Sequence, residues 1–397
     1  MLLTLGTLLV ACGSSGVTPS PAGEGRSPTT VPTACSSGAT KCASSPRATT
    51  FPAPTTPTPI PATPTPTPLP GFLAASVTFV SPQDGWVLGT VGGNLALART
   101  QDGGTTWTGV TPPPATFLPS PGRSGVNGVR FADQQDGWVY GSQLWATHDG
   151  GASWSQVSLP GLNSSAGVIS PIQGLETAAG TVNAVYFGAS GFEIASAPVT
   201  SNSWAASATT VTFGGGPVPG AELVIQGSAG WVLENDRTVV GGARLQSGAW
   251  ASWTPACATA GGLAALAAST TQDLIAICDA GAWTSGTPTE QAYVSTDGGT
   301  SFSQLATALP AACQGSDALA SSTASVAAAG CGGEIVATFD GGGSWSSVYT
   351  GGAGTSITYV GFTTSTQGVA IAASTASLPG TLLMTHDGGH TWAPVTI

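Results

Sequence analysis

From residue 71 onward the chain alternates short apolar runs with polar, glycine-rich turns. Over the first such group, β-branched and aromatic residues alternate with small or polar ones, which predicts strands near 76–80, 85–89, 95–100 and 106–110. The same grouping recurs to the end of the chain. The pattern therefore predicts an all-β region of short antiparallel strands over residues 71–397.

One eight-residue motif recurs near the end of each group of strands. It reads Thr/Ser-x-Asp-Gly-Gly-x-Thr/Ser-Trp/Phe in five full copies, whose acidic residues are Asp102, Asp149, Asp297, Asp340 and Asp387. Two weaker copies place the seven terminal aromatic residues at positions 107, 154, 204, 253, 302, 345 and 392. A Gly-Trp-Val signature runs ahead of the motif at Trp86, Trp138 and Trp231. Repeats of about 40–50 residues with four strands each are propeller blades, so we expect a seven-bladed β-propeller of four-stranded antiparallel blades.

The repeated motif resembles the Asp-box, or BNR repeat, of sialidases, sortilins and related propellers. Together with Gly-Trp-Val it is most similar to the photosystem II stability and assembly factor family, and at the level of the repeat the resemblance covers residues 71–397. It implies that each Asp-box forms the hairpin between the third and fourth strands of a blade. The five Asp residues are then structural, because a carboxylate can accept backbone N–H bonds across the turn while the Gly pair allows positive φ.

The first residues indicate export. Residues 1–11, MLLTLGTLLVA, form an apolar run too short to span a bilayer as a helix. The run ends in Leu9-Val10-Ala11-Cys12, which resembles the lipobox of bacterial lipoproteins. The resemblance implies a signal peptide over 1–11 and lipidation of Cys12. We therefore expect an extracytoplasmic protein, exposed at the cell surface and attached to the bacterial membrane only through its lipid.

Residues 12–70 form a linker after the lipidated Cys. Pro and Thr dominate it, and they nearly alternate from Pro52 to Pro70. Such a chain buries little apolar surface and favours an extended polyproline II conformation. We expect a disordered, semi-rigid tether that holds the propeller away from the membrane.

The cysteines agree with an oxidising compartment. Once Cys12 is assigned to lipid, six remain, and the propeller pairs have sequence separations of 21 and 18. Each pair has one member before the first strand of a blade and one near the end of its second strand. This repeated placement favours the disulfides Cys257–Cys278 and Cys313–Cys331, with Cys35–Cys42 closing a small loop in the tether. No His lies near these cysteines in the sequence, so we expect no metal site and no cofactor.

Composition and charge exclude several classes of function. Only 7% of the residues are charged and the formal net charge is −11. A nucleic-acid-binding protein needs clustered Lys and Arg, and a polytopic membrane protein needs apolar runs of about 20 residues. The sequence has neither, so we expect no nucleic-acid partner.

The sequence supports an enzymatic function less well than a binding function. A sialidase would need three Arg for the substrate carboxylate, yet two of the five propeller Arg, Arg99 and Arg244, share one third-strand position and so indicate a blade surface. The Phe-Arg-Ile-Pro element typical of sialidase domains is absent from the sequence. A xyloglucanase-like or other glycoside hydrolase needs two carboxylates roughly 5–9.5 Å apart, and the eighteen acidic propeller residues leave that alternative open. His148, His386 and His390 adjoin Asp-boxes, where exposed turn residues are the better reading.

A ligand is expected on the face formed by the loops between second and third strands and between blades, opposite the Asp-boxes. The candidate binding residues near this face and the channel are Arg123, Arg130, Glu234, Asp236, Arg237, Asp279, Trp283, Glu290 and Glu334. Of these, Arg130 is expected on an innermost strand. We predict a monomeric, non-catalytic propeller that binds an envelope or extracellular protein as an assembly or scaffold factor. The alternative is a carbohydrate-binding module or a glycoside hydrolase.

Overall fold

The computed structural model describes residues 69–118, 124–162, 171–188, 191–207, 220–235, 239–259, 264–280, 289–313, 318–374 and 377–397. The predicted signal peptide and tether, with Cys12, Cys35 and Cys42, lie outside these residues, as do Arg123, Asp236, Arg237 and Trp283. Among the described residues, no helix combines the length and apolar character needed to cross a bilayer.

Consecutive strands pair antiparallel into blades of four. The first blade contains β1 (Phe72–Phe79), β2 (Gly85–Val91), β3 (Asn94–Thr100) and β4 (Thr108–Val110). The second contains β5 (Val126–Phe131), β6 (Gly137–Gly141), β7 (Leu144–Thr147) and β8 (Ser155–Val157). The third contains β9 (Ile172–Ala178), β10 (Thr181–Gly188), β11 (Gly191–Pro198) and β12 (Ala205–Ala206). The fourth contains β13 (Gly220–Gln226), β14 (Ala229–Asn235), β15 (Val239–Gln246) and β16 (Ala249–Ser252).

The remaining blades follow the same order. The short 3₁₀ helix η1 (Ala256–Thr259) precedes the fifth blade, which contains β17 (Ala264–Ala268), β18 (Leu274–Ala280), β19 (Thr289–Ser295) and β20 (Ser303–Ala308). The sixth contains β21 (Leu319–Thr323), β22 (Val326–Cys331), β23 (Glu334–Thr338) and β24 (Ser346–Thr350). The seventh contains β25 (Thr355–Phe362), β26 (Gly368–Ser374), β27 (Ser377–Thr385) and β28 (Ala393–Pro394). The described residues thus confirm the predicted seven-bladed β-propeller.

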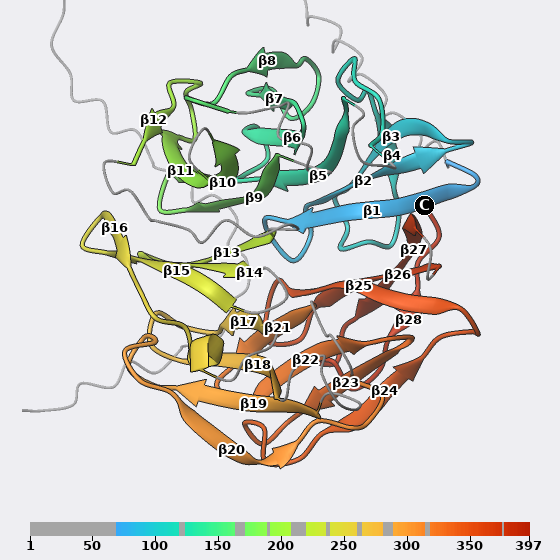
Figure 1. Ribbon diagram of the computed structural model, residues 1–397. Helices are drawn as coiled ribbons and strands as arrows, with labels where there is room; N and C mark the ends of the chain where they lie inside the picture. The colour runs from blue at the N-terminus through green and yellow to red at the C-terminus, as the bar shows by residue number, and fades with distance from the viewer. Residues whose placement is uncertain are drawn as a thin grey trace, which may run out of the picture. The chain divides into compact units, whose positions relative to one another are not determined.

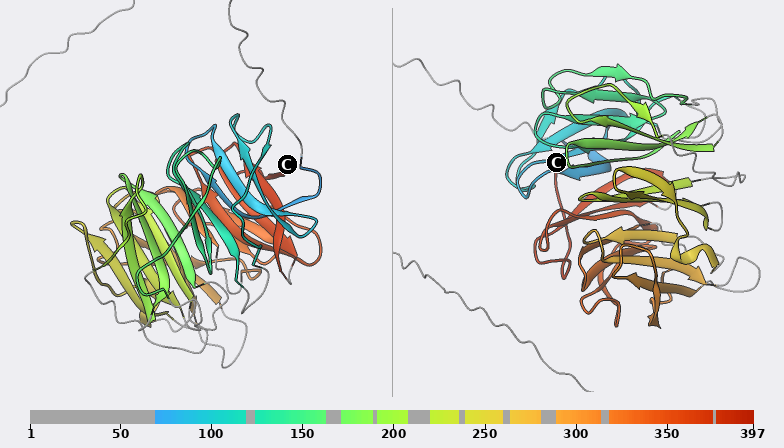
Figure 2. Two further views of the ribbon diagram at one scale, coloured as in Figure 1. Left: turned by 90° about the horizontal axis from the view of Figure 1, so that it is seen from above. Right: turned by 90° about the vertical axis from the view of Figure 1, so that its left-hand side faces the viewer.

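The blades surround a centre on which the first strand of each blade converges (Figure 1). The side views show neighbouring sheets packed face to face (Figure 2). A contact between Ala74 of β1 and Gly380 of β27 joins the first and seventh blades, so that these two form one eight-stranded sheet. The ring therefore closes although each blade is built only from consecutive strands.

The apolar core lies between the blades, in seven separate clusters of buried side chains. Each cluster combines residues of two neighbouring blades. The cluster between blades one and two is centred on Trp86, which is fully buried and stacks on Phe131 with ring centroids 3.9 Å apart. Val369 and Ile371 pack against Val77 and Val87 at the closing junction. Because a single blade cannot bury its own faces, these junctions provide most of the stabilisation of the ring.

The two recurring aromatic positions of the repeat pack against opposite neighbouring blades. Trp86, Trp138 and Trp231 of the Gly-Trp-Val signature pack toward the following blade. The Asp-box aromatic residues Trp154 and Trp392 pack toward the preceding one. The junction between blades one and two is therefore filled from both sides, by Trp86 and by Trp154.

The fourth blade departs from the predicted repeat. There a two-residue turn, Ser247-Gly248, with φ of 52° and 80°, joins β15 to β16 in place of an Asp-box. The shorter hairpin moves Trp250 into the position that packs against the third blade, whereas Trp253 packs against Phe302 of the fifth. The assignment of Trp253 as the equivalent aromatic residue of this blade was therefore wrong.

Candidate functional site

The Asp-box hairpins form one rim of the propeller and share a common set of hydrogen bonds. At Asp297, Oδ1 accepts from the Ser295 hydroxyl at 2.8 Å and from the Ser301 amide at 2.9 Å, and Oδ2 accepts from the Ser301 hydroxyl at 2.6 Å. Equivalent contacts recur at Asp102, Asp149, Asp340 and Asp387. The carboxylate closes the turn from inside, which makes the Asp-box a structural element.

Glycines make this turn possible. Gly103 and Gly104 have φ of 71° and 90°, the left-handed region that side chains rarely adopt. A Cβ atom at Gly104 would also lie 2.5 Å from the sulfur of Met384 in the seventh blade. The second Gly of the motif thus permits both the turn and the close approach of the neighbouring blade.

The Asp-box hydrogen bonds predict a stability loss in acid. Hydroxyl and amide donors from Ser153, Ser301 and Ser344 lower the pKa of Asp149, Asp297 and Asp340 to about 2. Because the pKa of these carboxyl groups is lower in the folded state than in the unfolded state, their ionised forms stabilise the fold. This stabilisation is fully present above the unfolded pKa near 3.8 and is lost as pH falls through about 2. We therefore expect the urea concentration at the midpoint of unfolding to be lower at pH 2 than at pH 5.

The variant Asp297→Asn tests this assignment. This variant should be less stable than the wild type at pH 7, and its stability should decrease less than that of the wild type between pH 4 and pH 2. Glu334→Gln, which removes a carboxylate outside any Asp-box, serves as the control and should retain the wild-type slope. An unchanged acid slope in Asp297→Asn would show that the hydrogen bonds of this turn do not set the acid stability.

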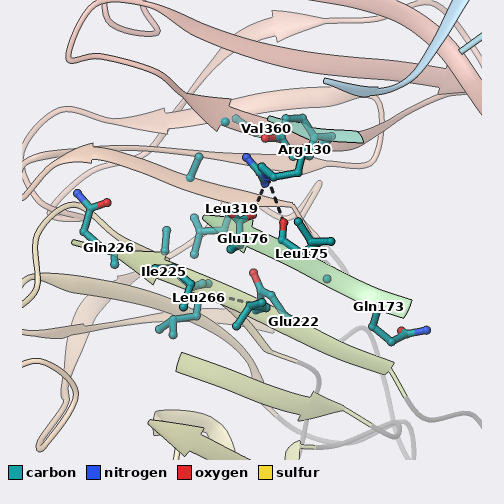
Figure 3. Close-up of a pocket in the computed structure, with 18 of the residues that line it drawn as sticks. Arg130, Gln173, Leu175, Glu176, Glu222, Ile225, Gln226, Leu266, Leu319 and Val360 are labelled. Carbon is teal, nitrogen blue, oxygen red and sulfur yellow. Dashed lines mark hydrogen bonds and ion pairs between the residues drawn. The ribbon is translucent and has the colours of Figure 1, made fainter. Parts of the chain in front are cut away.

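A central channel with a volume of about 860 Å³ lies among the described residues. Its walls come from the first strand of every blade, with Tyr140 of β6 added. Polar side chains enter it from β5, β9 and β13, and leucines, valines and alanines form much of the rest (Figure 3). The volume is within the range of about 300–1,000 Å³ that is usual for ligand pockets.

Arg130 occupies the most highly charged part of the channel. Its guanidinium forms an ion pair with Glu176 of the neighbouring blade, and its Nε donates to the Leu175 carbonyl at 3.1 Å (Figure 3). Burial is the strongest single influence and lowers the pKa of Arg130, but the Glu176 carboxylate together with Tyr359 and Tyr140 outweighs it, so the net shift is upward. Tyr140 and Tyr359 lie beside the pair, and burial raises the pKa of Tyr140 to about 12. The cluster is a fixed polar anchor shared by blades two, three and seven.

Other polar side chains on the channel strands hold the next blade in place. They satisfy backbone groups at the inner edges of neighbouring sheets, which have no strand to pair with. These bonds are Val129 N to Ser76 Oγ at 3.0 Å, Ala221 N to Gln173 Oε1 at 3.4 Å and Leu266 N to Glu222 Oε2 at 3.1 Å. The channel wall thus carries polar side chains that are hydrogen-bonded to the neighbouring blade.

The sequence-predicted candidates fall into different places. Arg130 lines the channel, as expected for an innermost strand. Glu234 and Glu290, expected as binding residues near the loop face, lie within β14 and β19 and are 1% and 2% exposed. Asp279 lies in β18 opposite Glu290, and Glu334 begins β23. They therefore lie near the strand ends of three neighbouring blades.

The channel residues Glu176, Glu222, Gln173 and Tyr359 were not among the predicted candidates. The sequence signal for such residues is a polar side chain inside the first strand of a blade, next to apolar residues that belong to the core. In β9, Gln173 and Glu176 are part-buried while Ile172 and Leu175 are buried. A polar residue at such a position faces the channel rather than a junction between blades.

Both predicted propeller disulfides are present. Cys257 of η1 bonds to Cys278 of β18, and Cys313 bonds to Cys331 of β22. Glu290 lies close to the second disulfide, with its carboxylate and the two sulfurs within 4.8 Å of one another. Since these sulfurs are bonded to each other, they are not available as thiolate ligands.

Two of the Asp-box histidines connect neighbouring blades. His148 contacts Asp136 at 2.5 Å and Asn202 at 3.3 Å. His390 stacks on Phe339 of the sixth blade with ring centroids 3.8 Å apart. Arg99 and Arg244 act similarly, since Arg99 stacks over Trp86 and Arg244 donates to the Thr300 hydroxyl of the next Asp-box at 2.9 Å. These basic side chains serve the junctions between blades.

Comparisons with known proteins agree with this architecture. Residues 71–207, the first three blades, match the family model of the photosynthesis system II assembly factor YCF48. A solved structure of YCF48 bound to D1 peptide is 19% identical, covers 81% of this chain and 95% of its own, and superposes with a TM-score of 0.56. YCF48 from Cyanidioschyzon merolae is 18% identical, with coverages of 80% and 97% and a TM-score of 0.55.

The same fold occurs in an enzyme. A virginiamycin B lyase from Staphylococcus aureus is 12% identical, covers 79% of this chain and 95% of its own, and has a TM-score of 0.53. No curated protein matches the sequence. Fold alone therefore does not decide between binding and catalysis. The chain is an Asp-box β-propeller similar to the YCF48 assembly-factor family, with the sequence match carried by its first three blades.

Proposed function

We propose that this chain is a lipid-anchored extracytoplasmic protein whose propeller binds a partner protein as an assembly or scaffold factor, without chemistry. The observation that carries the proposal is the central channel, a cavity of about 860 Å³ lined by polar groups from several blades. The similarity to a YCF48 propeller that has been solved with a D1 peptide supports protein binding. The lipobox-like Leu9-Val10-Ala11-Cys12 supports the anchor, and the two disulfides suit an oxidising compartment.

Site-specific photo-crosslinking in the native cells tests partner binding. A photoreactive amino acid at Gln173, on a channel strand, should capture a discrete protein partner. The same group at Ser303, an exposed residue at the start of β20, serves as the control and should capture none. Absence of any crosslinked protein from the channel position, with the protein shown to be folded, would contradict the proposal.

The anchor has its own test. Cys12→Ala should abolish incorporation of labelled fatty acid and move the protein from the membrane fraction to the soluble fraction. Retention of label in Cys12→Ala would rule out lipidation at this residue.

A glycan-directed function is the second candidate, and one observation favours it. Two carboxylates, Glu176 and Glu222, line the same channel, and glycoside hydrolases use paired carboxylates. Both are already engaged, Glu176 with Arg130 and Glu222 with the Leu266 amide, which suits positioning better than proton transfer. Reproducible binding of the folded chain to one sugar class on a glycan array would favour this candidate over a protein partner.

A further inference from the structure

A smaller cavity lies between the fifth and sixth blades, which are neighbours in the ring (Figure 1). Its volume is about 130 Å³. The buried side chains of Ile275 in β18 and Ala327 in β22 are part of its lining. Thr296, Ala324 and Ser325 also line it and are exposed. The cavity therefore has a buried floor and opens to solvent beside the Asp-box of the fifth blade.

Strand register shows which residue of the repeat stands at this floor. In the first blade, Trp86 follows the residue that pairs with the first position of the Asp-box. In the fifth blade, Leu274 pairs with Ser295, which is the first position of that Asp-box. The next residue, Ile275, therefore takes the place of Trp86, and it faces the sixth blade as Trp86 faces the second.

The aromatic partner of that Trp is replaced as well. Trp86 stacks on Phe131, which pairs with Gly137 of its own blade. In the sixth blade the corresponding residue is Ser321, because it pairs with Ala327, and Ala327, like Gly137, pairs with the first residue of an Asp-box. Ser321 lines the cavity together with Ile275. The cavity thus lies where two stacked rings fill the junction between blades one and two.

Four other junctions keep one of these two rings. Trp138 and Trp231 occupy the first position, facing blades three and five. Phe362 and Phe79 occupy the second position, facing blades six and seven. The junction between blades five and six differs from these because both positions have lost the aromatic side chain.

The wall of the cavity suits an apolar ligand. Its hydroxyl groups at Ser295 and Thr338 donate to Asp-box carboxylates, and that of Ser321 donates to backbone carbonyls. Ile275 and Val294 add aliphatic surface. A buried water needs two to four polar partners, whereas an apolar cavity of about 150 Å³ is large enough to bind benzene.

The repeat also indicates a hydrogen-bond acceptor. At the junction between blades four and five, Nε1 of Trp231 donates to the carbonyl of Gly298 in the next Asp-box at 3.1 Å. Gly341 is the corresponding residue in the Asp-box of the sixth blade, and it lines the cavity. An indole ring at this place would therefore find both the space and the acceptor that Trp231 uses.

We propose that this cavity binds an indole ring from outside the chain, carried by a free small aromatic molecule or by an exposed Trp side chain. The ring takes the place of the Trp that Ile275 replaces, and its N–H donates to the carbonyl of Gly341. This inference goes beyond the proposed partner binding in the central channel and does not depend on it.

The test is a titration of the full chain, carrying Cys12→Ser so that it stays unlipidated, with indole. The signals observed are the isoleucine methyl groups by nuclear magnetic resonance. We expect the ring current to shift the Ile275 methyl signal in a saturable way, with a Kd on the order of 1 mM or tighter. Ile371, buried between the seventh and first blades, serves as the internal control and should not shift.

A second titration distinguishes the two sources of the ring. N-acetyltryptophanamide represents a Trp side chain on a backbone. A saturable shift of the Ile275 signal with both compounds would show that a protein side chain can enter, and a shift with indole alone would assign the site to free small molecules. Indene, which has the shape of indole without the N–H, should bind about three- to tenfold more weakly than indole.

Variants at position 275 locate the ring by calorimetry. Ile275→Trp should weaken indole binding by about tenfold or more, because the new side chain occupies the cavity itself. Ile275→Leu preserves the volume of the side chain and should bind indole within about threefold of the wild type. Circular dichroism checks that both variants fold, and if Ile275→Trp does not, the methyl shifts of the unsubstituted site still decide.

Three results would count against the inference. Absence of a saturable Ile275 shift with either compound would refute the site. Wild-type affinity of folded Ile275→Trp for indole would place the ring elsewhere and refute it too. Equal affinities for indole and indene would refute the hydrogen bond to Gly341. None of these results bears on partner capture at Gln173, so this inference and the proposed function can fail separately.

Discussion

Trp86→Ala is expected to lower the free energy of unfolding by about 3–5 kcal/mol, the usual cost of removing a large aromatic side chain from a core. Trp86 is fully buried between the first two blades, stacked on Phe131 on one side and covered by Arg99 on the other. Its removal leaves a cavity at a junction that both blades need. Urea unfolding followed by fluorescence and by circular dichroism measures the loss, provided that the two transitions coincide.

Trp86→Phe is the matched control for this prediction. It preserves an aromatic ring against Phe131 and should cost less than half as much as the alanine variant. A loss below about 1 kcal/mol in Trp86→Ala would mean that this junction relaxes around the missing ring, and that the blades depend on one another less than their packing indicates.

Removal of either propeller disulfide should cost about 3 kcal/mol, because each closes a loop of roughly twenty residues in the unfolded chain. The sequence separations are 21 for Cys257–Cys278 and 18 for Cys313–Cys331, so the double variants Cys257→Ala/Cys278→Ala and Cys313→Ala/Cys331→Ala should lose similar amounts. All four cysteines are at most 1% exposed, so alanine avoids placing a hydroxyl in an apolar site. Urea midpoints of the two variants measure the effect.

Reduction of the wild-type protein provides the independent check. Because the sulfurs are buried, dithiothreitol should react slowly with the folded protein and should lower the thermal midpoint once thiol titration shows that reduction is complete. Fully reduced protein with an unchanged midpoint would show that the disulfides do not stabilise the ring.

The blade architecture could be predicted from the sequence because its determinants are local. An Asp-box fixes its own turn through contacts within seven residues, so five full copies mark five hairpins without reference to the rest of the fold. The fourth blade broke this rule, since Ser247-Gly248 forms a shorter turn that shifts the aromatic register to Trp250. A turn of a different length cannot be recognised from motif spacing alone.

The channel could not be assembled from the sequence in the same way. Arg130 and Glu176 are 46 residues apart and meet because two blades place their first strands side by side around the ring. The polar run Glu234-Asn235-Asp236-Arg237 favours a loop, yet β14 continues through Asn235 and buries Glu234. Polar residues at strand ends are read as loop residues when the neighbouring blade that covers them is unknown.

The way the ring closes has a further consequence for the modularity of the chain. Because β1–β4 and β25–β28 are each complete blades, no strand is borrowed across the junction, and side-chain packing with the Ala74–Gly380 contact joins the ends. Pro70, Gly71, Thr396 and Ile397 line one small cavity there, so the two ends of the propeller are neighbours. Closure of the ring therefore does not require the chain to begin with the first blade and end with the seventh. A circularly permuted chain, joined at this point and opened between two other blades, would contain the same seven junctions, and whole blades are the natural units by which such a chain could be lengthened or shortened.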